Sequence, residues 1–132
     1  MTQENKELLL KDICARLPYG VKVKDTYYKS LEPAPIWLLD LNAQCVRLFA
    51  DEGYQSIEYI KPYLFPLSSM TEEQKEEFNT RSLELQLKVI DDEIMYEKAT
   101  EFEVDFYNKH HLDWRGLIPM GLAIDATNLN IY

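Results

Sequence analysis

Glycine, cysteine and histidine are scarce in this chain of 132 residues, which holds four glycines, two cysteines and two histidines. Four scattered glycines cannot form the glycine-rich loop that cradles phosphates ahead of a helix, so we expect no nucleotide hydrolase. The two cysteines, Cys14 and Cys45, lie among apolar neighbours, which favours a reduced pair over a disulfide. Neither has an evident histidine base that would activate it as a nucleophile.

Long hydrophobic runs are absent as well. The apolar run nearest the start covers only residues 8–10, far less than the apolar region of a signal peptide. No run approaches the roughly 20 apolar residues that a helix needs to cross a bilayer. We therefore expect a cytoplasmic protein with no membrane partner. No Cys-x-x-Cys or His-x-x-x-His pair is present, and we expect no metal or other cofactor.

Basic charge is the third shortage, because 14 lysines and arginines face 23 aspartates and glutamates, for a net charge of −9. The excess is local: residues 71–105 contain twelve acids and four bases. A protein that binds duplex DNA gathers Lys and Arg against the phosphates, and only the short set Lys22, Lys24 and Lys29 comes near that pattern. Direct nucleic-acid binding is disfavoured. The acidic segment is either a solvated helix face or an acidic decoy of a nucleic-acid-binding protein.

Apolar and aromatic residues, in contrast, are plentiful, at 46% and 12% of the chain with nine tyrosines. This composition predicts a folded protein, and the length fits one domain over residues 1–132. The order of the patterns predicts an α+β fold. It should have an N-terminal helix, a small antiparallel three-stranded meander, two or three helices in the second half and an irregular C-terminal tail.

The first half of the chain carries the helix and the meander. Apolar residues recur at helical spacing from about residue 3 to 17, after which Pro18 and Gly20 stop the helix. Val21 and Val23 then alternate with lysines, as in a strand with one solvated face. Two further strands, at about residues 36–41 and 45–49, should form a hairpin, which completes a meander between residues 21 and 49.

A proline-containing connection should join the two halves. Residues 56–59 could form a short helical turn, and residues 61–66 contain two prolines, which should impose an extended, irregular path.

The second half begins with a capping box, in which Thr71 precedes Gln74 by three residues, and this pattern predicts a helix that reaches about residue 88. Residues 83–95 fit both a helical and a strand periodicity. A last helix should run from about residue 98 to 110, before the irregular tail over residues 112–132. We expect the core to contain Leu10, Cys14, Leu17, Val21, Val23, Leu39, Val46, Leu48, Phe102 and Phe106.

The densest group of chemically capable side chains lies at the end of that last helix and just after it. It consists of His110, His111, Asp113, Trp114 and Arg115. Adjacent helical residues point about 100° apart, so the two histidines cannot easily bind one metal ion. A structural role is favoured, in which one imidazole caps the helix, the other packs beneath Trp114, and Arg115 clasps Asp113, Asp105 or free helix carbonyls. The alternative is a small hydrolase or metal-dependent enzyme centred on this group.

An aromatic group in the first half forms a second candidate. Its members are Tyr19, Tyr27, Tyr28, Trp37, Tyr54, Tyr59 and Tyr63. Tyrosine and tryptophan combine a large apolar area with a polar atom and are enriched at protein interfaces, so the group could be a recognition surface. The other reading places these rings on strands, half-buried, with their hydroxyls in solvent.

Three segments carry a resemblance to a known family. They run over residues 16–23 (RLPYGVKV), 60–73 (IKPYLFPLSSMTEE) and 105–118 (DFYNKHHLDWRGLI). In them the chain resembles a family of small uncharacterised proteins of gut anaerobic bacteria and their prophages. Members usually have a basic residue where this chain has Phe65, which removes a charge from the proline-containing connection. The family implies a lineage but no activity.

Three functions remain open from the sequence. The first is a non-enzymatic protein of a mobile element or prophage that binds an unknown protein partner through its aromatic or acidic face; an exposed apolar patch of several hundred Å² would support it. The second is the enzyme centred on His110, His111, Asp113 and Arg115, which needs a pocket with converging polar groups. The third is the acidic decoy, which needs carboxylates spaced along one exposed face.

Overall fold

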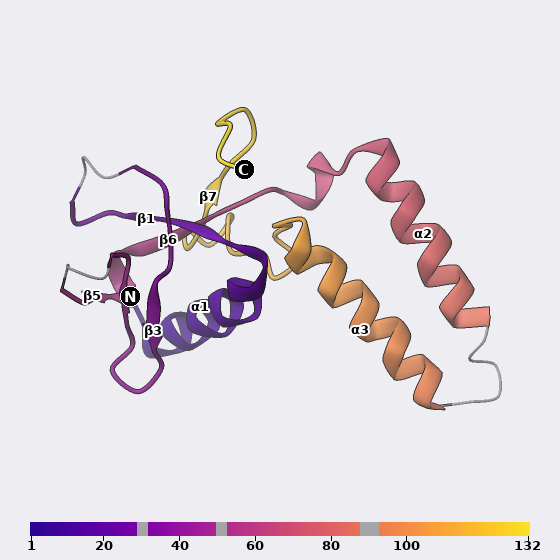
Figure 1. The fold of residues 1–132 in the computed structure, drawn as a ribbon, viewed down its shortest axis with the longest axis horizontal. Helices are drawn as coiled ribbons and strands as arrows, with labels where there is room; N and C mark the ends of the chain where they lie inside the picture. The colour runs from indigo at the N-terminus through magenta and orange to yellow at the C-terminus, as the bar shows by residue number, and fades with distance from the viewer. Residues whose placement is uncertain (29–31, 50–52, 88–92) are drawn as a thin grey trace.

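The computed structural model describes the backbone of residues 1–28, 32–49, 53–87 and 93–132, and the side chains of these residues other than 86, 87 and 93–99. The fold is α+β, as the sequence predicts, with an N-terminal helix, an antiparallel three-stranded sheet and two later helices (Figure 1). The elements are α1 (Gln3–Arg16), η1 (Leu17–Tyr19), β1 (Lys22–Asp25), β2 (Ala34–Pro35), β3 (Leu38–Asp40), β4 (Cys45–Arg47), β5 (Gln55–Ser56), η2 (Ile57–Tyr59), β6 (Ile60–Leu64), η3 (Leu67–Ser69), α2 (Glu72–Leu87), α3 (Glu93–Lys109) and β7 (Ile124–Asp125).

Helix α1 turns a different face to the core from the one that we expected. Its buried positions are Leu9, Leu10, Asp12, Ile13 and Arg16. The predicted core residues Cys14 and Leu17 are exposed instead. The helical spacing was right, but a buried Asp12–Arg16 ion pair occupies part of the inward stripe. A prediction that counts only apolar residues therefore places the buried face of the helix part of a turn away from its actual position.

The strands form two sheets, and this corrects the expected meander. A four-stranded sheet has the order β2-β1-β6-β7, in which β1 is antiparallel to β2 and β6 and β7 is parallel to β6. The three-stranded antiparallel sheet is β3-β4-β5. The predicted hairpin between the second and third strands is confirmed as β3-β4. The first predicted strand, β1, pairs elsewhere, because residues 60–64 supply it with a longer partner.

Strand β6 is the second correction, since the sequence predicted an irregular path there. Thr26 donates its N–H to the carbonyl oxygen of Tyr59 over 2.7 Å, just before β6 begins. Residue pairs in an antiparallel ladder alternate between hydrogen-bonded and non-hydrogen-bonded. The Val23–Pro62 pair lies three pairs away from this bonded pair and is therefore non-hydrogen-bonded. Strand β1 therefore needs no N–H from Pro62. The short helical turn expected ahead of β6 is confirmed as η2.

The core lies where α1, the two sheets and the segment after α3 meet. Burial of Leu10, Val21, Val23, Val46, Leu48 and Phe106 is confirmed, whereas Leu39 and Phe102 are only partly buried. The tail contributes Leu117, Leu122 and Ala123 to the same core. It is less irregular than predicted, because residues 124 and 125 form β7 beside β6.

Helices α2 and α3 form a hairpin that extends away from the sheets (Figure 1). The predicted capping box is confirmed at its start: Thr71 N–H donates to Gln74 Oε1 over 3.0 Å, and Gln74 N–H donates to Thr71 Oγ1 over 3.1 Å. Residues 83–87 and 93–95 are helical, and residues 88–92 lie outside the described part. The helices pack through Phe78, whose ring contacts Phe102 and Phe106. No described helix is long and apolar enough to cross a membrane.

Candidate functional site

The end of α3 is closed by the backbone of His111. His111 has a φ of 57° and donates its N–H to the Asn108 carbonyl, while Leu112 N–H donates to the Tyr107 carbonyl over 2.8 Å. This pair of bonds is a Schellman motif, whose left-handed residue is usually glycine. A non-glycine residue there costs about 1–2 kcal/mol. The expected imidazole cap is wrong, because the main chain closes the helix.

The His111 ring has a different neighbour from the one that we expected. It stacks on Tyr132 rather than Trp114, with ring centres 3.7 Å apart and planes 9° apart. Burial lowers the pKa of His111 to about 4, and the nearby charges of Arg16, His110 and Lys22 act in the same direction. Its Nδ1 has no hydrogen-bond partner among the described residues. His111 is therefore a neutral, packed ring at pH 7.

Tyr132 holds the tail against the four-stranded sheet. Its hydroxyl donates to the Tyr63 carbonyl over 2.7 Å and accepts from Lys22 N–H over 2.9 Å. Lys22 Nζ also donates to the Ile131 carbonyl over 2.8 Å. The stacked His111 ring thus contacts a residue whose other end is bonded to β1 and β6.

His110 points to α2 instead. Its Nδ1 lies 3.4 Å from Gln74 Nε2, and its ring lies over Phe106. Burial lowers the pKa of His110 against the opposing charge of Glu77. The ring borders a hollow of about 250 Å³ that Phe65 and Leu112 also line. Because the two imidazoles contact different elements, they do not converge on one ligand.

Asp113 and Trp114 are used in local structure. Both carboxylate oxygens of Asp113 accept backbone N–H groups at 2.8 Å, from Leu117 and from Ile118. Trp114 Nε1 donates to Asn108 Oδ1 over 3.0 Å. Asp113 therefore organises the turn that brings Leu117 into the core.

Arg115 lies against Trp114 and pairs with α1. Its guanidinium is 4.0 Å from the centre of the Trp114 ring, and its Nε is 3.2 Å from Asp12 Oδ1, without hydrogen-bond geometry. Asp12 also accepts from Arg16 Nε over 2.9 Å, and Arg16 donates to the Leu112 carbonyl over 2.7 Å. Arg115 contacts Asp12 rather than the expected Asp113 or Asp105. The arrangement links the segment after α3 to α1.

The side chains of residues 110–115 thus contact several different elements and do not converge on one point. Within the described residues, no group of three or more His, Cys, Asp or Glu side chains could hold a metal ion. Cys45 does not resemble an activated nucleophile either, because burial and the charge of Asp40 raise the pKa of its thiol.

A different set of side chains is exposed on the three-stranded sheet. Val46 of β4 faces the core, so its neighbour Arg47 projects from the opposite face, across from Leu38 of β3. The guanidinium of Arg47 lies 4.3 Å from the centre of the Tyr54 ring and 5.8 Å from that of Trp37. Trp37 is 56% exposed and Tyr54 48%. We call Trp37, Leu38, Arg47 and Tyr54 the aromatic face.

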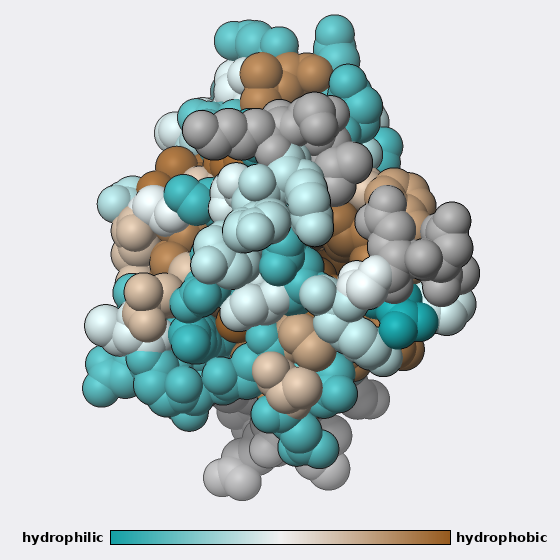
Figure 2. Space-filling view, turned by 90° about the vertical axis from the view of Figure 1, so that its left-hand side faces the viewer, coloured by the Kyte–Doolittle hydropathy of each residue, from teal (hydrophilic) through white to brown (hydrophobic). Residues whose placement is uncertain are grey.

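Strands β3 and β5 lie on the left-hand side of the molecule in Figure 1. Figure 2 views the molecule from that side and shows apolar areas separated by hydrophilic ones. Of the aromatic group in the sequence, Tyr27 and Tyr28 are exposed too, whereas Tyr63 is buried. Sequence reasoning missed Arg47. The hairpin register, which sets Arg47 opposite Leu38, was the signal that could have found it.

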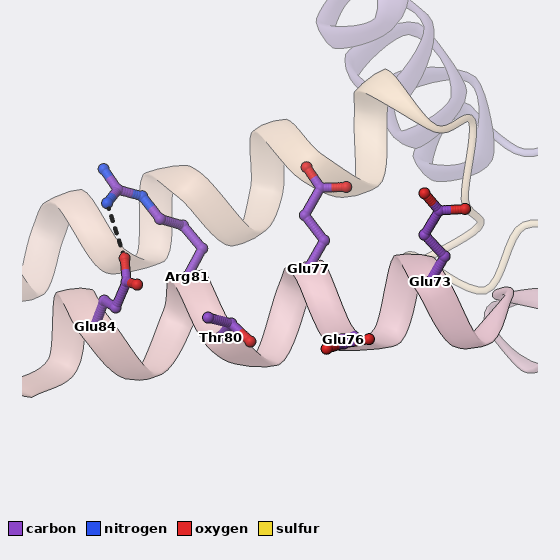
Figure 3. Close-up of a pocket in the computed structure, with 6 residues that line it drawn as sticks. All are labelled: Glu73, Glu76, Glu77, Thr80, Arg81 and Glu84. Carbon is purple, nitrogen blue, oxygen red and sulfur yellow. Dashed lines mark hydrogen bonds and ion pairs between the residues drawn. The ribbon is translucent and has the colours of Figure 1, made fainter.

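The acidic residues of α2 form a third surface. Figure 3 shows Glu73, Glu77 and Arg81 along this helix, with Arg81 bonded to Glu84 over 3.2 Å. Glu76 and Thr80 complete the lining of this open, shallow groove. Its acids are solvated, and one of them is neutralised by the arginine.

Comparison of the chain with protein-family models, with curated proteins and with solved structures finds no match. The resemblance to a family of gut bacteria and their prophages therefore stays a prediction.

Proposed function

We propose that this chain is a non-enzymatic protein-binding module that contacts its partner through the aromatic face. The observation that carries the proposal is a pair of exposed rings, Trp37 and Tyr54, which the partly buried Arg47 contacts on one side of a small sheet. Tryptophan, tyrosine and arginine are the residue types most enriched among the side chains that dominate binding energy. A face that holds all three in contact is suited to be the centre of an interface.

The exposed area supports the same proposal. An aromatic side chain covers 150–250 Å² when fully enclosed, so two half-exposed rings leave on the order of 100 Å² each. Leu38, which lies opposite Arg47 and is 41% exposed, adds apolar area. Several hundred Å² is the size of the functional patches found on soluble proteins. A typical interface of about 800 Å² per partner would have this face as its apolar centre.

The acidic decoy fits the structure less well. Glu73, Glu76, Glu77 and Glu84, less Arg81, leave three net negative charges over a stretch of α2 that spans about 16 Å. That is about one charge per 5 Å, whereas duplex DNA carries one per 1.7 Å of axis. The negative charge density along this part of α2 is therefore about a third of the density that a DNA-binding protein meets on duplex DNA.

The enzyme alternative ranks lowest, because His110 and His111 contact different elements and Asp113 is bonded to two backbone amides. We further propose a cytoplasmic location and a mobile-element or prophage origin. The origin rests on the family resemblance of the three segments alone.

Site-specific photo-crosslinking in the native host tests the proposal. A photoreactive phenylalanine analogue would replace Leu38 on the aromatic face or, as a matched control, Leu83, an exposed leucine of α2. We expect a discrete protein adduct from position 38 that is lost when Trp37→Ala is added, and none from position 83. Adducts from position 83 alone would favour the acidic helix. Equal adducts from both positions, or adducts that persist in Trp37→Ala, would contradict the proposal.

A further inference from the structure

We infer that the aromatic face binds a partner segment that sets a carboxylate against Arg47, next to an apolar side chain that packs on Trp37 and Tyr54. This inference rests on the proposed function and specifies the partner's chemistry. Its basis is the position of Arg47 among the charges of the chain.

Arg47 differs from the other arginines of this protein. The chain has four arginines, and three of them form ion pairs: Arg16 and Arg115 with Asp12, and Arg81 with Glu84. Arg47 contacts two aromatic rings instead and has no ion pair with any described residue. In a chain with a net charge of −9, an arginine without an ion pair to any described acid retains its charge for an outside group.

The acids of neighbouring elements that the structure describes have other partners. Asp25 accepts from the Gln55 amide over 3.2 Å, and Asp40 accepts from Ala43 N–H over 3.0 Å. Glu58 lies 3.8 Å from Lys6 Nζ. Because these acids have other partners, none of the three in β1, β3 and η2 pairs with the positive charge of Arg47.

The geometry of the contacts suits a carboxylate. Rings that lie against a guanidinium occupy its flat side, and its N–H groups point outward in the plane, where a carboxylate can accept two of them at once. The Nε of Arg47 is enclosed and has no acceptor among the described residues, so the partner's carboxylate would accept from the terminal Nη groups. The aromatic contacts also restrict the long side chain, so less conformational freedom is lost on binding than for a free arginine. An acidic side chain beside an apolar one would use both parts of the face.

Selection of short random peptides displayed on phage, against the purified chain, supplies the probe. We expect the enriched peptides to share an Asp or Glu next to an aromatic or aliphatic residue. Arg47→Met, which keeps the unbranched apolar stem, should weaken binding of a synthetic enriched peptide about 10- to 100-fold. Arg81→Met is the matched control and should leave the affinity unchanged. Far-ultraviolet circular dichroism and thermal melting check that each variant is folded.

A double-mutant cycle then assigns the contact. Replacement of the peptide's acid by its amide should weaken binding to the wild-type chain by a similar factor, but should have little further effect on Arg47→Met. Additive losses would overturn the carboxylate contact. Enriched peptides that have no acid but lose binding in Trp37→Ala would also overturn it, while the proposed function would stand. Two outcomes would count against both the carboxylate contact and the proposed function. One is failure to enrich any peptide whose binding depends on Trp37 or Tyr54, and the other is competition with the peptide by a second copy of the chain.

Discussion

Asp12 of α1 and Arg115 of the segment after α3 form an ion pair of 3.2 Å, although most of the chain separates them in sequence. Asp12 is fully buried and pairs with Arg16 as well, so one carboxylate holds two arginines. A buried acid requires such partners, because an ionised carboxylate away from water is otherwise strongly destabilising. The pair joins the first helix to the segment that follows the last one.

The first prediction concerns Arg115→Ala in the absence of any ligand. Removal of a charged partner and of its packing on Trp114 should lower the free energy of unfolding by about 1–3 kcal/mol. Urea denaturation of the variant beside the wild type measures it. Arg81→Ala, which breaks an exposed pair, should change it by less than about 0.5 kcal/mol. An unchanged or higher stability of Arg115→Ala would instead assign this arginine to a ligand.

The second prediction concerns the shared acid. Asp12→Ala leaves the fully buried Arg16 without its carboxylate and removes the partner of Arg115. Loss of one member of a buried pair costs about 3–5 kcal/mol, so this variant should be destabilised more than Arg115→Ala. The same denaturation series compares them. A cost of Asp12→Ala equal to that of an exposed pair such as Glu84→Ala would show that the buried network contributes little.

The third prediction is a pH dependence caused by His111. Its pKa is about 4 in the folded chain and about 6.5 when unfolded, so the unfolded state binds the proton first as the pH falls. Stability should therefore decrease from pH 6.5 to pH 4, with a contribution on the order of 3 kcal/mol from this residue. His111→Asn tolerates the left-handed backbone and cannot titrate. It should be less stable at pH 7 because the stacking is lost.

The difference between wild type and His111→Asn isolates that contribution, because the carboxyl groups titrate in both proteins. We expect the two stability curves to converge as the pH is lowered from 6.5 to 4. Parallel curves would mean that His111 takes up its proton in the folded chain as easily as in the unfolded chain. Chemical denaturation at several pH values provides the measurement.

Some of the candidate sites could be anticipated from local patterns. The aromatic residues and the His110–Arg115 stretch stood out in the sequence, and Arg115 was expected to bind an acid. Its actual partner, Asp12, could not be deduced, because contact between residues so far apart depends on how α1 and α3 pack. Arg47 was missed for a related reason: a single arginine on a strand is ordinary until its neighbours across the sheet are known.

Short-range interactions control the features that could be predicted from the sequence. These are the α+β class, the Thr71–Gln74 cap, the β3-β4 hairpin and the stop after α1, each of which depends on residues within a few positions of one another. The buried face of α1 and the pairing of β1 with β6 rather than with the meander depend on tertiary contacts. Burial of Asp12 and Arg16 is favourable only as a pair with contacts outside the helix, and strand pairing depends on distant backbone groups. Neither can be read from periodicity.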